Sequence, residues 1–191
     1  SWSTKDMRIE GLPRPMKYCD FQIENASGVL MVLAKIQDEY PVSTENIKQG
    51  LSSFRLKGRF QIIPGAIPKI LDVAHNRQSI KALVNNLKMI PCYGKTHIIL
   101  GMLKDKDHQQ VIKELIEVSD TWHFVSISQD RGIKAKILTS ELKALGRLEN
   151  ISEYSNVEEA LDKIHKLSMP DDRIIITGSF YTVGAAIRYL N

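Results

Sequence analysis

Four short polar segments of this chain each follow a predicted strand directly, and they carry the side chains best suited to bind a ligand. The first segment places an acid, an imidazole and an amide close together, a set that can hydrogen-bond a sugar hydroxyl, a phosphate or an amino group. If the strands are parallel, all four segments lie at one edge of a sheet, where open α/β folds bind ligands. This predicts where a site lies without naming its reaction. The segments are Asp72-Val73-Ala74-His75-Asn76, Gly101-Met102-Leu103-Lys104-Asp105-Lys106-Asp107, Gln129-Asp130-Arg131-Gly132 and Gly178-Ser179-Phe180-Tyr181-Thr182.

Each of these residues also has a purely structural explanation. Asp72 and Asn76 have the side chains of helix caps, and a helix is predicted to begin near Arg77. Ser179 lies where a strand meets a helix, so it either caps that helix or belongs to a site where backbone N–H groups bind a carboxylate or phosphate. Arg131 offers a bidentate clamp for a carboxylate, although an exposed loop arginine is the commoner case. Spacing alone leaves these alternatives open.

Alternating strand and helix patterns from about residue 60 onward predict the scaffold that would position these segments. Strands separated by helices of this length imply an α/β fold with a mostly parallel, doubly wound (Rossmann-like) sheet and helices on both faces. Ser155 and Glu158 have capping-box spacing at the start of the fourth helix. The predicted strands cover residues 60–63, 69–73, 97–100, 124–127 and 173–177, and the predicted helices lie around residues 80–87, 111–116, 137–145, 157–164 and 182–190.

The first 55 residues do not follow this alternation. Ala26–Ile36 reads as an apolar-rich helix, and Ser43 is expected to cap a short second helix that runs toward Leu51. We interpret residues 1–55 as the tail of a preceding domain plus a linker, and residues 56–191 as the α/β domain. The chain begins Ser1-Trp2-Ser3 without an initiator Met, as expected of a piece of a longer protein.

Composition excludes several classes of protein. The 26 Lys and Arg residues against 22 Asp and Glu give a net charge of +4, spread along the chain, so no nucleic-acid partner is expected. The longest apolar run, Val29–Ala34, is far below the roughly 20 residues of a membrane span. Cys19 and Cys92 form no CxxC pair and are expected to be free thiols in a reducing compartment, the cytoplasm.

Motifs for other chemistries are absent from the sequence. The histidines lack metal-ligand spacing, so no metal site is expected within this chain. The sequence has no GxSxG, HExxH or GxGxxG motif, and no GxxxxGK[ST] loop that would cradle a triphosphate.

Taken together, the loops resemble those of bacterial folylpolyglutamate synthase / dihydrofolate synthase, a branch of the Mur ligase superfamily. The resemblance extends from about Asn25 to the C-terminus, and the Asp-x-Ala-His-Asn element alone indicates only the superfamily. Arg77 departs from the family, which often has Pro there. The motifs that carry the resemblance, in chain order, are Lys57-Gly58-Arg59-Phe60-Gln61, Leu71-Asp72-Val73-Ala74-His75-Asn76, Gly101-Met102-Leu103-Lys104-Asp105-Lys106-Asp107 and Gly178-Ser179-Phe180-Tyr181-Thr182-Val183.

The resemblance implies an ATP-dependent ligase that adds L-glutamate to dihydropteroate or reduced folates through an acyl phosphate. It also implies that the P-loop and the Mg²⁺ ligands belong to an N-terminal ATPase domain, so this chain alone is expected to be inactive. The family is usually monomeric. In this family Asn25 matches a position near the adenine, Arg59 matches an arginine that reaches ATP, and Asp72 matches a nucleotide-contacting acid. His75, in the same loop, is the candidate catalytic residue, and our own suggestion places the glutamate carboxylate near Ser179 or Arg131.

Two other functions remain as alternatives. A Mur-type peptidoglycan amino-acid ligase would share the superfamily element, but Gly58-Arg59-Phe60-Gln61 and Gly178-Ser179-Phe180 argue against it. A non-catalytic, receiver-like α/β domain could place Asp72 at a strand end, yet it would need a Lys after the last strand, which ends in Thr177-Gly178-Ser179.

Overall fold

The computed structural model of the chain describes residues 1–5, 7–16 and 21–191, and Cys19 lies outside them. The chain divides into two compact units, residues 1–56 and 57–191. No helix in the described ranges is long and apolar enough to cross a membrane.

The N-terminal unit is a small helical pair with a short hairpin. Strands β1 (Trp2–Ser3) and β2 (Arg8–Ile9), which the sequence pattern did not predict, pair antiparallel and stay separate from the larger sheet. Helix α1 (Phe21–Ile36) starts five residues before its predicted start, and α2 (Thr44–Ser53) is capped by Ser43 as predicted. The small core of this unit consists of Ile9, Leu30 and Ile47 with Trp2, Met7, Leu12, Leu33, Val42 and Leu51 around them.

The C-terminal unit is built on a six-stranded sheet in the order β3-β4-β8-β5-β6-β7. Only β3 runs antiparallel to its neighbour, and the other five strands are parallel, which confirms the predicted mostly parallel sheet. The strands are β3 (Gln61–Ile63), β4 (Lys69–Leu71), β5 (Thr96–Leu100), β6 (Thr121–Val125), β7 (Ile151–Tyr154) and β8 (Arg173–Thr177).

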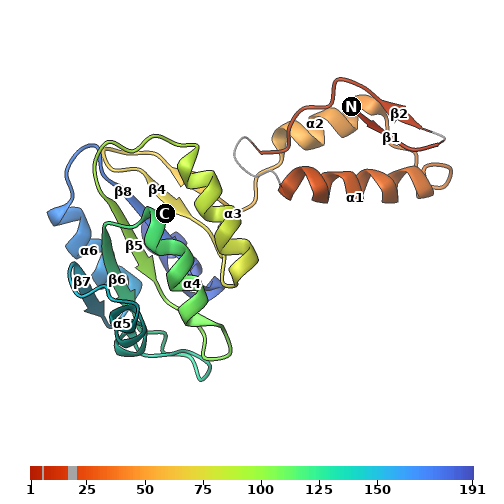
Figure 1. Cartoon of the computed structure of the whole chain (residues 1–191). Coiled ribbons are helices and arrows are strands. Elements are labelled where there is room, and N and C mark those ends of the chain that lie inside the picture. The colour runs from red at the N-terminus through yellow and green to blue at the C-terminus, as the bar shows by residue number, and fades with distance from the viewer. Residues whose placement is uncertain (6, 17–20) are drawn as a thin grey trace. The chain divides into compact units, whose positions relative to one another are not determined.

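Helices cover both faces of this sheet (Figure 1). Helices α3, α4 and α5 pack side by side on one face, and α6 packs against α7 on the other. Alternate strand residues such as Leu71, Ile99 and Ile176 form a core with α6 and α7, as the period of two along a strand requires. The helical elements are α3 (Arg77–Lys88), α4 (His108–Leu115) with the 3-10 turn η1 (Ile116–Val118), α5 (Ala135–Ala144), α6 (Val157–Leu167) and α7 (Phe180–Leu190).

The position of β8 creates the topological switch of the fold. Strand β8 is the last in sequence but lies between β4 and β5, the first two parallel strands. The chain leaves β4 and β5 toward helices on one face, whereas it leaves β8 toward α7 on the other. Crevices form where neighbouring strands send their connections to opposite faces, so the fold places its natural ligand site at the carboxyl end of β8.

Three local predictions need correction. Strand β7 was missed, and β6 begins at Thr121, three residues before its predicted start. The cap of α6 is Asn156, whose side chain accepts from the Glu159 N–H; the Glu159 carboxylate in turn accepts from the Ser155 N–H. The predicted capping box was therefore one residue out of register.

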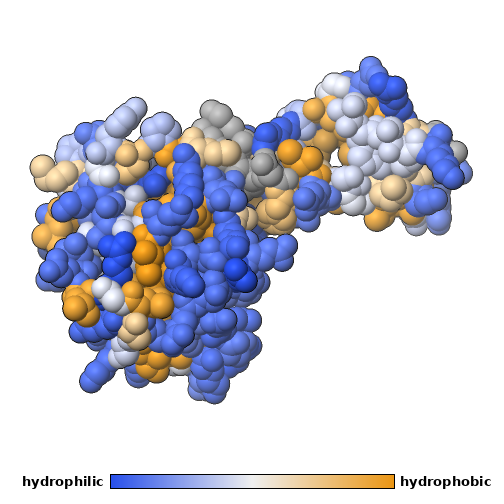
Figure 2. Space-filling view, in the orientation of Figure 1, coloured by the Kyte–Doolittle hydropathy of each residue, from blue (hydrophilic) through white to orange (hydrophobic). Residues whose placement is uncertain are grey.

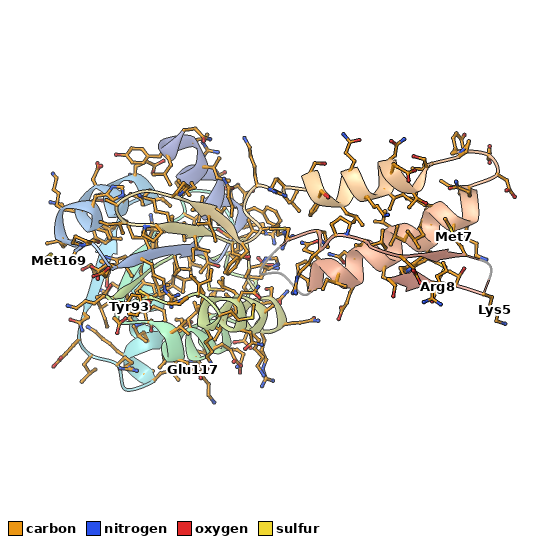
Figure 3. The ribbon with its side chains drawn as sticks, turned by 90° about the horizontal axis from the view of Figure 1, so that it is seen from above. Lys5, Met7, Arg8, Tyr93, Glu117 and Met169 are labelled. Atoms are coloured by element: carbon orange, nitrogen blue, oxygen red, sulfur yellow. The ribbon has the colours of Figure 1, made fainter. Side chains whose placement is uncertain are left out.

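A polar network lies at the amino edge of the sheet, the side on which Figure 3 shows the loop residues Tyr93 and Met169. Asp172 accepts from His97 Nε2 (3.1 Å), and the other ring nitrogen of His97, Nδ1, lies 2.7 Å from the Thr121 hydroxyl oxygen. The same hydroxyl oxygen lies 3.0 Å from His123 Nε2, and His123 Nδ1 lies 3.3 Å from the Tyr154 hydroxyl oxygen.

Acid should therefore weaken the fold through His123. Burial lowers the pKa of the His123 imidazole to about 4, with a smaller contribution from the charge of His97. The unfolded chain binds this proton near the ordinary value of 6.5, so stability falls as the pH drops from 6.5 toward 4, by on the order of 3 kcal/mol in all. Urea unfolding at several pH values measures this loss. His123→Phe should flatten the dependence in this window, and an equally steep dependence in that variant would contradict the assignment.

Candidate functional site

A tight turn before β3 carries Arg59 to the carboxyl end of β4. Gly58 has a φ of +69°, and a Cβ there would lie 2.9 Å from Val183, so only glycine fits. Phe60 is buried with a φ of +45°, which is strained for an aromatic residue. The turn is held by the Gly58 carbonyl, which accepts from the Val73 N–H (2.8 Å), and by Asp72.

Asp72 braces this turn with both of its carboxylate oxygens. Oδ2 accepts from the Phe60 N–H and Oδ1 accepts from the Ala74 N–H, each at 2.8 Å. Burial raises the pKa of the Asp72 carboxyl, and the two N–H groups and the charge of Arg59 offset part of that rise. The capping role considered for Asp72 was wrong, because Asn76 alone caps α3.

Arg59, His75 and Phe180 form a cluster where β4 and β8 end. The Arg59 guanidinium lies over the Phe180 ring at 5.6 Å, and the His75 ring lies 6.2 Å from the same ring. His75 Nδ1 is 2.8 Å from the Val73 carbonyl, which can only accept, so Nδ1 carries the proton. The lone pair of neutral His75 is then on Nε2. Phe180 is 62% exposed, although aromatic side chains are usually more deeply buried.

Glycines let the ends of β8 and β5 approach closely. Gly178 has a φ of +103°, and a Cβ there would lie 2.6 Å from the Gly101 carbonyl oxygen. The Ala74 carbonyl accepts from both the Gly178 N–H (3.0 Å) and the Thr177 hydroxyl (3.1 Å). The Thr182 hydroxyl donates to the Gly101 carbonyl (2.9 Å). Hydrogen bonds therefore connect three of the four polar segments, those at residues 72–76, 101–107 and 178–182, at the switch point.

Ser179 is the N-cap of helix α7. Its hydroxyl oxygen accepts from the Thr182 N–H (3.0 Å) and lies 2.7 Å from the Thr182 hydroxyl, and only 3% of the residue is exposed. Because the Thr182 hydroxyl proton goes to Gly101, the Ser179 proton goes to Thr182. These bonds favour the capping explanation for Ser179 over direct contact with a ligand.

Arg131 lies at the same edge, two strands away from β8. Its Nη2 bonds the Asp105 carboxylate at 2.8 Å, and the Lys104 N–H donates to its carbonyl (2.8 Å). The hydrogen bond from Arg131, followed by that from Lys106, lowers the pKa of Asp105 to about 2. Arg131 thus clamps a carboxylate of its own chain, and its guanidinium remains 60% exposed.

Asn25 belongs to the N-terminal unit. It is exposed on α1, where its amide donates to Gln22 (3.2 Å), and it lines a cavity of about 360 Å³ between α1 and α2. The other candidate residues lie in the second unit.

Sequence reasoning missed two members of the site. Phe180 was quoted within a motif but given no role, although an aromatic residue directly after a predicted strand was a usable signal. Asp105 was also quoted without a role, and its pairing with Arg131 joins two loops that the sequence does not relate. The described residues include no group of three or more His, Cys, Asp or Glu that could hold a metal ion.

Comparison with known proteins gives a matching family and related sequences. The family described as Mur ligase, glutamate ligase domain matches residues 58–180. The dihydrofolate synthase/folylpolyglutamate synthase of Escherichia coli (strain K12) is 30% identical over 192 residues, covering 100% of this chain and 43% of that protein.

Solved structures give the same result. A crystal structure of a bifunctional folylpolyglutamate synthase/dihydrofolate synthase with Mn, AMPPNP and L-glutamate bound is 33% identical, with a TM-score of 0.84, over 98% of this chain and 43% of that one. The E. coli FolC in complex with DHPP and ADP is 29% identical, also with a TM-score of 0.84, over 98% and 42% of the two chains. The chain thus spans less than half the length of the relatives it matches. It belongs to the Mur ligase, glutamate ligase domain family, and its relatives are the folylpolyglutamate and dihydrofolate synthases.

Proposed function

We propose that this chain is the C-terminal part of an ATP-dependent ligase that adds L-glutamate to dihydropteroate, to reduced folates or to both. ATP phosphorylates a carboxylate of the pterin or folate acceptor, which gives an acyl phosphate and ADP. The amino group of glutamate then attacks the acyl carbon, and phosphate leaves as the amide forms. The names of the relatives support this reaction class, and one of them is described with a nucleotide analogue and glutamate bound. We also propose that the complete enzyme is a cytoplasmic monomer that acts on these small molecules.

The observation that carries this proposal is the Arg59–Phe180–His75 cluster at the topological switch. Most polar side chains around this cluster make hydrogen bonds that hold the loops together. Arg59 is different, because its fixed fork of donors lies against an aromatic ring at the surface, a geometry suited to phosphate oxygens. Within the described part of the chain, His75 Nε2 has no hydrogen-bond partner and can accept a proton or a hydrogen bond.

In this proposal Arg59 binds the nucleotide phosphates and His75 is the candidate catalytic group beside them. Asp72 stays in the nucleotide site as a positioning residue, because its two backbone hydrogen bonds set the turn that carries Arg59. Arg131 remains the candidate for the glutamate carboxylate, which would have to compete with Asp105. Ser179 contributes through the helix it caps, and Asn25 is proposed to lie near the adenine in the complete enzyme.

ATP and Mg²⁺ are the proposed co-substrate and metal. The described residues offer no cluster that fits a divalent cation, so we propose that the Mg²⁺ ligands and the phosphate loop belong to the N-terminal part of the complete enzyme. The ion would neutralise phosphate charge. The residues of this chain would bind the nucleotide from the opposite side and exclude water that hydrolyses an acyl phosphate.

The N-terminal unit supports the proposal that residues 1–55 are the tail of an ATPase domain and a linker. Helix α1 buries Leu30 but exposes several other apolar side chains, and exposed apolar surface of this kind is typical of an interface with another part of a protein. Hydrophobic residues accordingly reach the surface of this unit in Figure 2. The exposed apolar side chains of α1 are Phe21, Ile23, Val29, Met31, Val32 and Ile36.

Arg59→Ala in the full-length enzyme should lower kcat/KM for glutamate addition by about 100-fold or more, the scale of losing a cation that faces developing phosphate charge. Its folding stability should fall by less than about 1 kcal/mol, because the side chain is partly exposed and makes one cation–π contact. Steady-state kinetics and thermal unfolding measure the two effects. The control is Arg55→Ala, since among the described residues the Arg55 side chain bonds only to the carbonyls of Ser52 and Phe54. Parent-like ligation by Arg59→Ala would remove Arg59 from the site.

Asp72→Ala should behave differently, because it leaves the Phe60 and Ala74 N–H groups without their buried acceptor. The free energy of unfolding should fall by roughly 2–4 kcal/mol, and ligation should fall with it. Chemical denaturation of the chain measures the loss. Asp105→Ala, which removes an exposed carboxylate from the same edge, should change stability little. A variant at Asp72 that ligates poorly but is as stable as the parent would instead point to direct contact with the nucleotide.

A further inference from the structure

The guanidinium of Arg59 is held by one specific contact. Within the described part of the chain it makes no hydrogen bond and no ion pair, and its Cζ lies 5.6 Å from the centre of the Phe180 ring. The charge of Arg59 acts on Asp72, but both Asp72 oxygens accept from backbone N–H groups. The turn before β3 therefore fixes the backbone of Arg59, and the Phe180 ring is what limits its side chain.

An ordered guanidinium matters because a long arginine side chain is otherwise free to rotate about several bonds. Ordering such a side chain when a ligand arrives costs conformational entropy. An aromatic face attracts a cation through its quadrupole, so it can hold the fork of donors before the ligand binds. A guanidinium that is held in advance loses less freedom when it binds an anion.

The backbone that carries the Phe180 ring is itself fixed. Phe180 is the first residue of α7, directly after the N-cap Ser179. The Ser179 hydroxyl accepts from the Thr182 N–H (3.0 Å), and the Thr182 hydroxyl donates to the Gly101 carbonyl (2.9 Å). The ring is therefore attached to an anchored helix end, where an element can set the geometry of a neighbouring side chain.

Core packing does not explain the ring. Phe180 is 62% exposed, whereas Val183 and Ala186 of the same helix belong to the buried core beneath it. The neighbouring Tyr181 is also exposed (48%), but within the described residues it contacts no cation and no other ring. A single exposed aromatic residue is ordinary. Phe180 differs because Arg59 lies over its ring and the His75 ring lies 6.2 Å away.

We propose that Phe180 is a positioning residue, whose exposed ring holds the Arg59 guanidinium ready for an anion at the carboxyl edge of the sheet. Phe180 acts through Arg59 and does not itself bind the nucleotide. The consequence for ligation rests on the proposed function, in which Arg59 binds the nucleotide phosphates. The ordering of the Arg59 side chain does not rest on it.

Nitrogen-15 relaxation of the Arg59 Nε–H group in the full-length enzyme tests the ordering. Phe180→Leu removes the aromatic face and keeps an apolar side chain, so the order parameter of this group should fall below about 0.6, the range of a flexible group. Phe180→Tyr should keep the parent value, because a phenol ring also attracts a cation. Tyr181→Leu is the matched control and should leave Arg59 as ordered as in the parent. An equally ordered Arg59 in Phe180→Leu would overturn the proposal.

Steady-state kinetics of the full-length ligase measure the consequence. Phe180→Leu should lower kcat/KM for ATP by about two- to fivefold, the scale of one exposed cation–π contact, and Phe180→Tyr should recover it. In an Arg59→Ala background, Phe180→Leu should cause no further loss, because the ring acts only through the guanidinium. Losses that multiply in the double variant would contradict the proposal. A KM for ATP that falls in Phe180→Leu would also contradict it, since the ring would then withhold Arg59 from the nucleotide.

The two measurements separate this proposal from the proposed function. If Arg59→Ala ligates like the parent while Phe180→Leu still releases the Arg59 side chain, the ring orders Arg59 as proposed and Arg59 leaves the nucleotide site. If Arg59→Ala is impaired and Phe180→Leu is not, Arg59 stays in the site and the positioning role of Phe180 fails.

Discussion

The insertion of β8 between β4 and β5 is the constraint on which the rest of the C-terminal unit depends. It forces three loops from distant parts of the chain to meet at one edge, and it turns the connection after β8 to the opposite face. The Ala74 carbonyl, with two donors from the end of β8, fixes the contact between the strands. Gly101 and Gly178 are needed because a Cβ at Gly101 would lie 2.5 Å from the Thr182 hydroxyl oxygen, and one at Gly178 would lie 2.6 Å from the Gly101 carbonyl oxygen.

Much of the polar chemistry at this edge builds the site and does not itself face a ligand. Asp72, Ser179 and Thr182 have their hydrogen bonds directed at backbone groups or at each other. Their role is to hold a strained turn and a helix end in place. Arg59 and His75 differ from these residues, because both lie beside the exposed Phe180 ring. Such a division fits a domain that presents a few groups to a nucleotide held mainly by another part of the enzyme.

The sequence predicted the strand and helix alternation well because the apolar residues of α3, α4 and α6 repeat with a clear helical period. It missed β7 because Ile151–Tyr154 is only four residues long, is partly exposed and includes a glutamate. The convergence of the four polar segments followed from parallel strands alone. Pairings across the fold did not follow, since spacing cannot show that Asp72 bonds Phe60, that Arg131 clamps Asp105, or that His108 meets Glu141.

We propose above that this chain belongs to a ligase that adds glutamate to a pterin or folate acceptor. The most direct measurement offers the full-length enzyme ATP, Mg²⁺ and glutamate with dihydropteroate and a reduced folate in separate reactions, and reads the products by mass. The account predicts an acceptor heavier by one glutamate residue in at least one reaction. A folded enzyme that adds glutamate to neither acceptor would contradict it, and muramyl nucleotides would then be the acceptors to try.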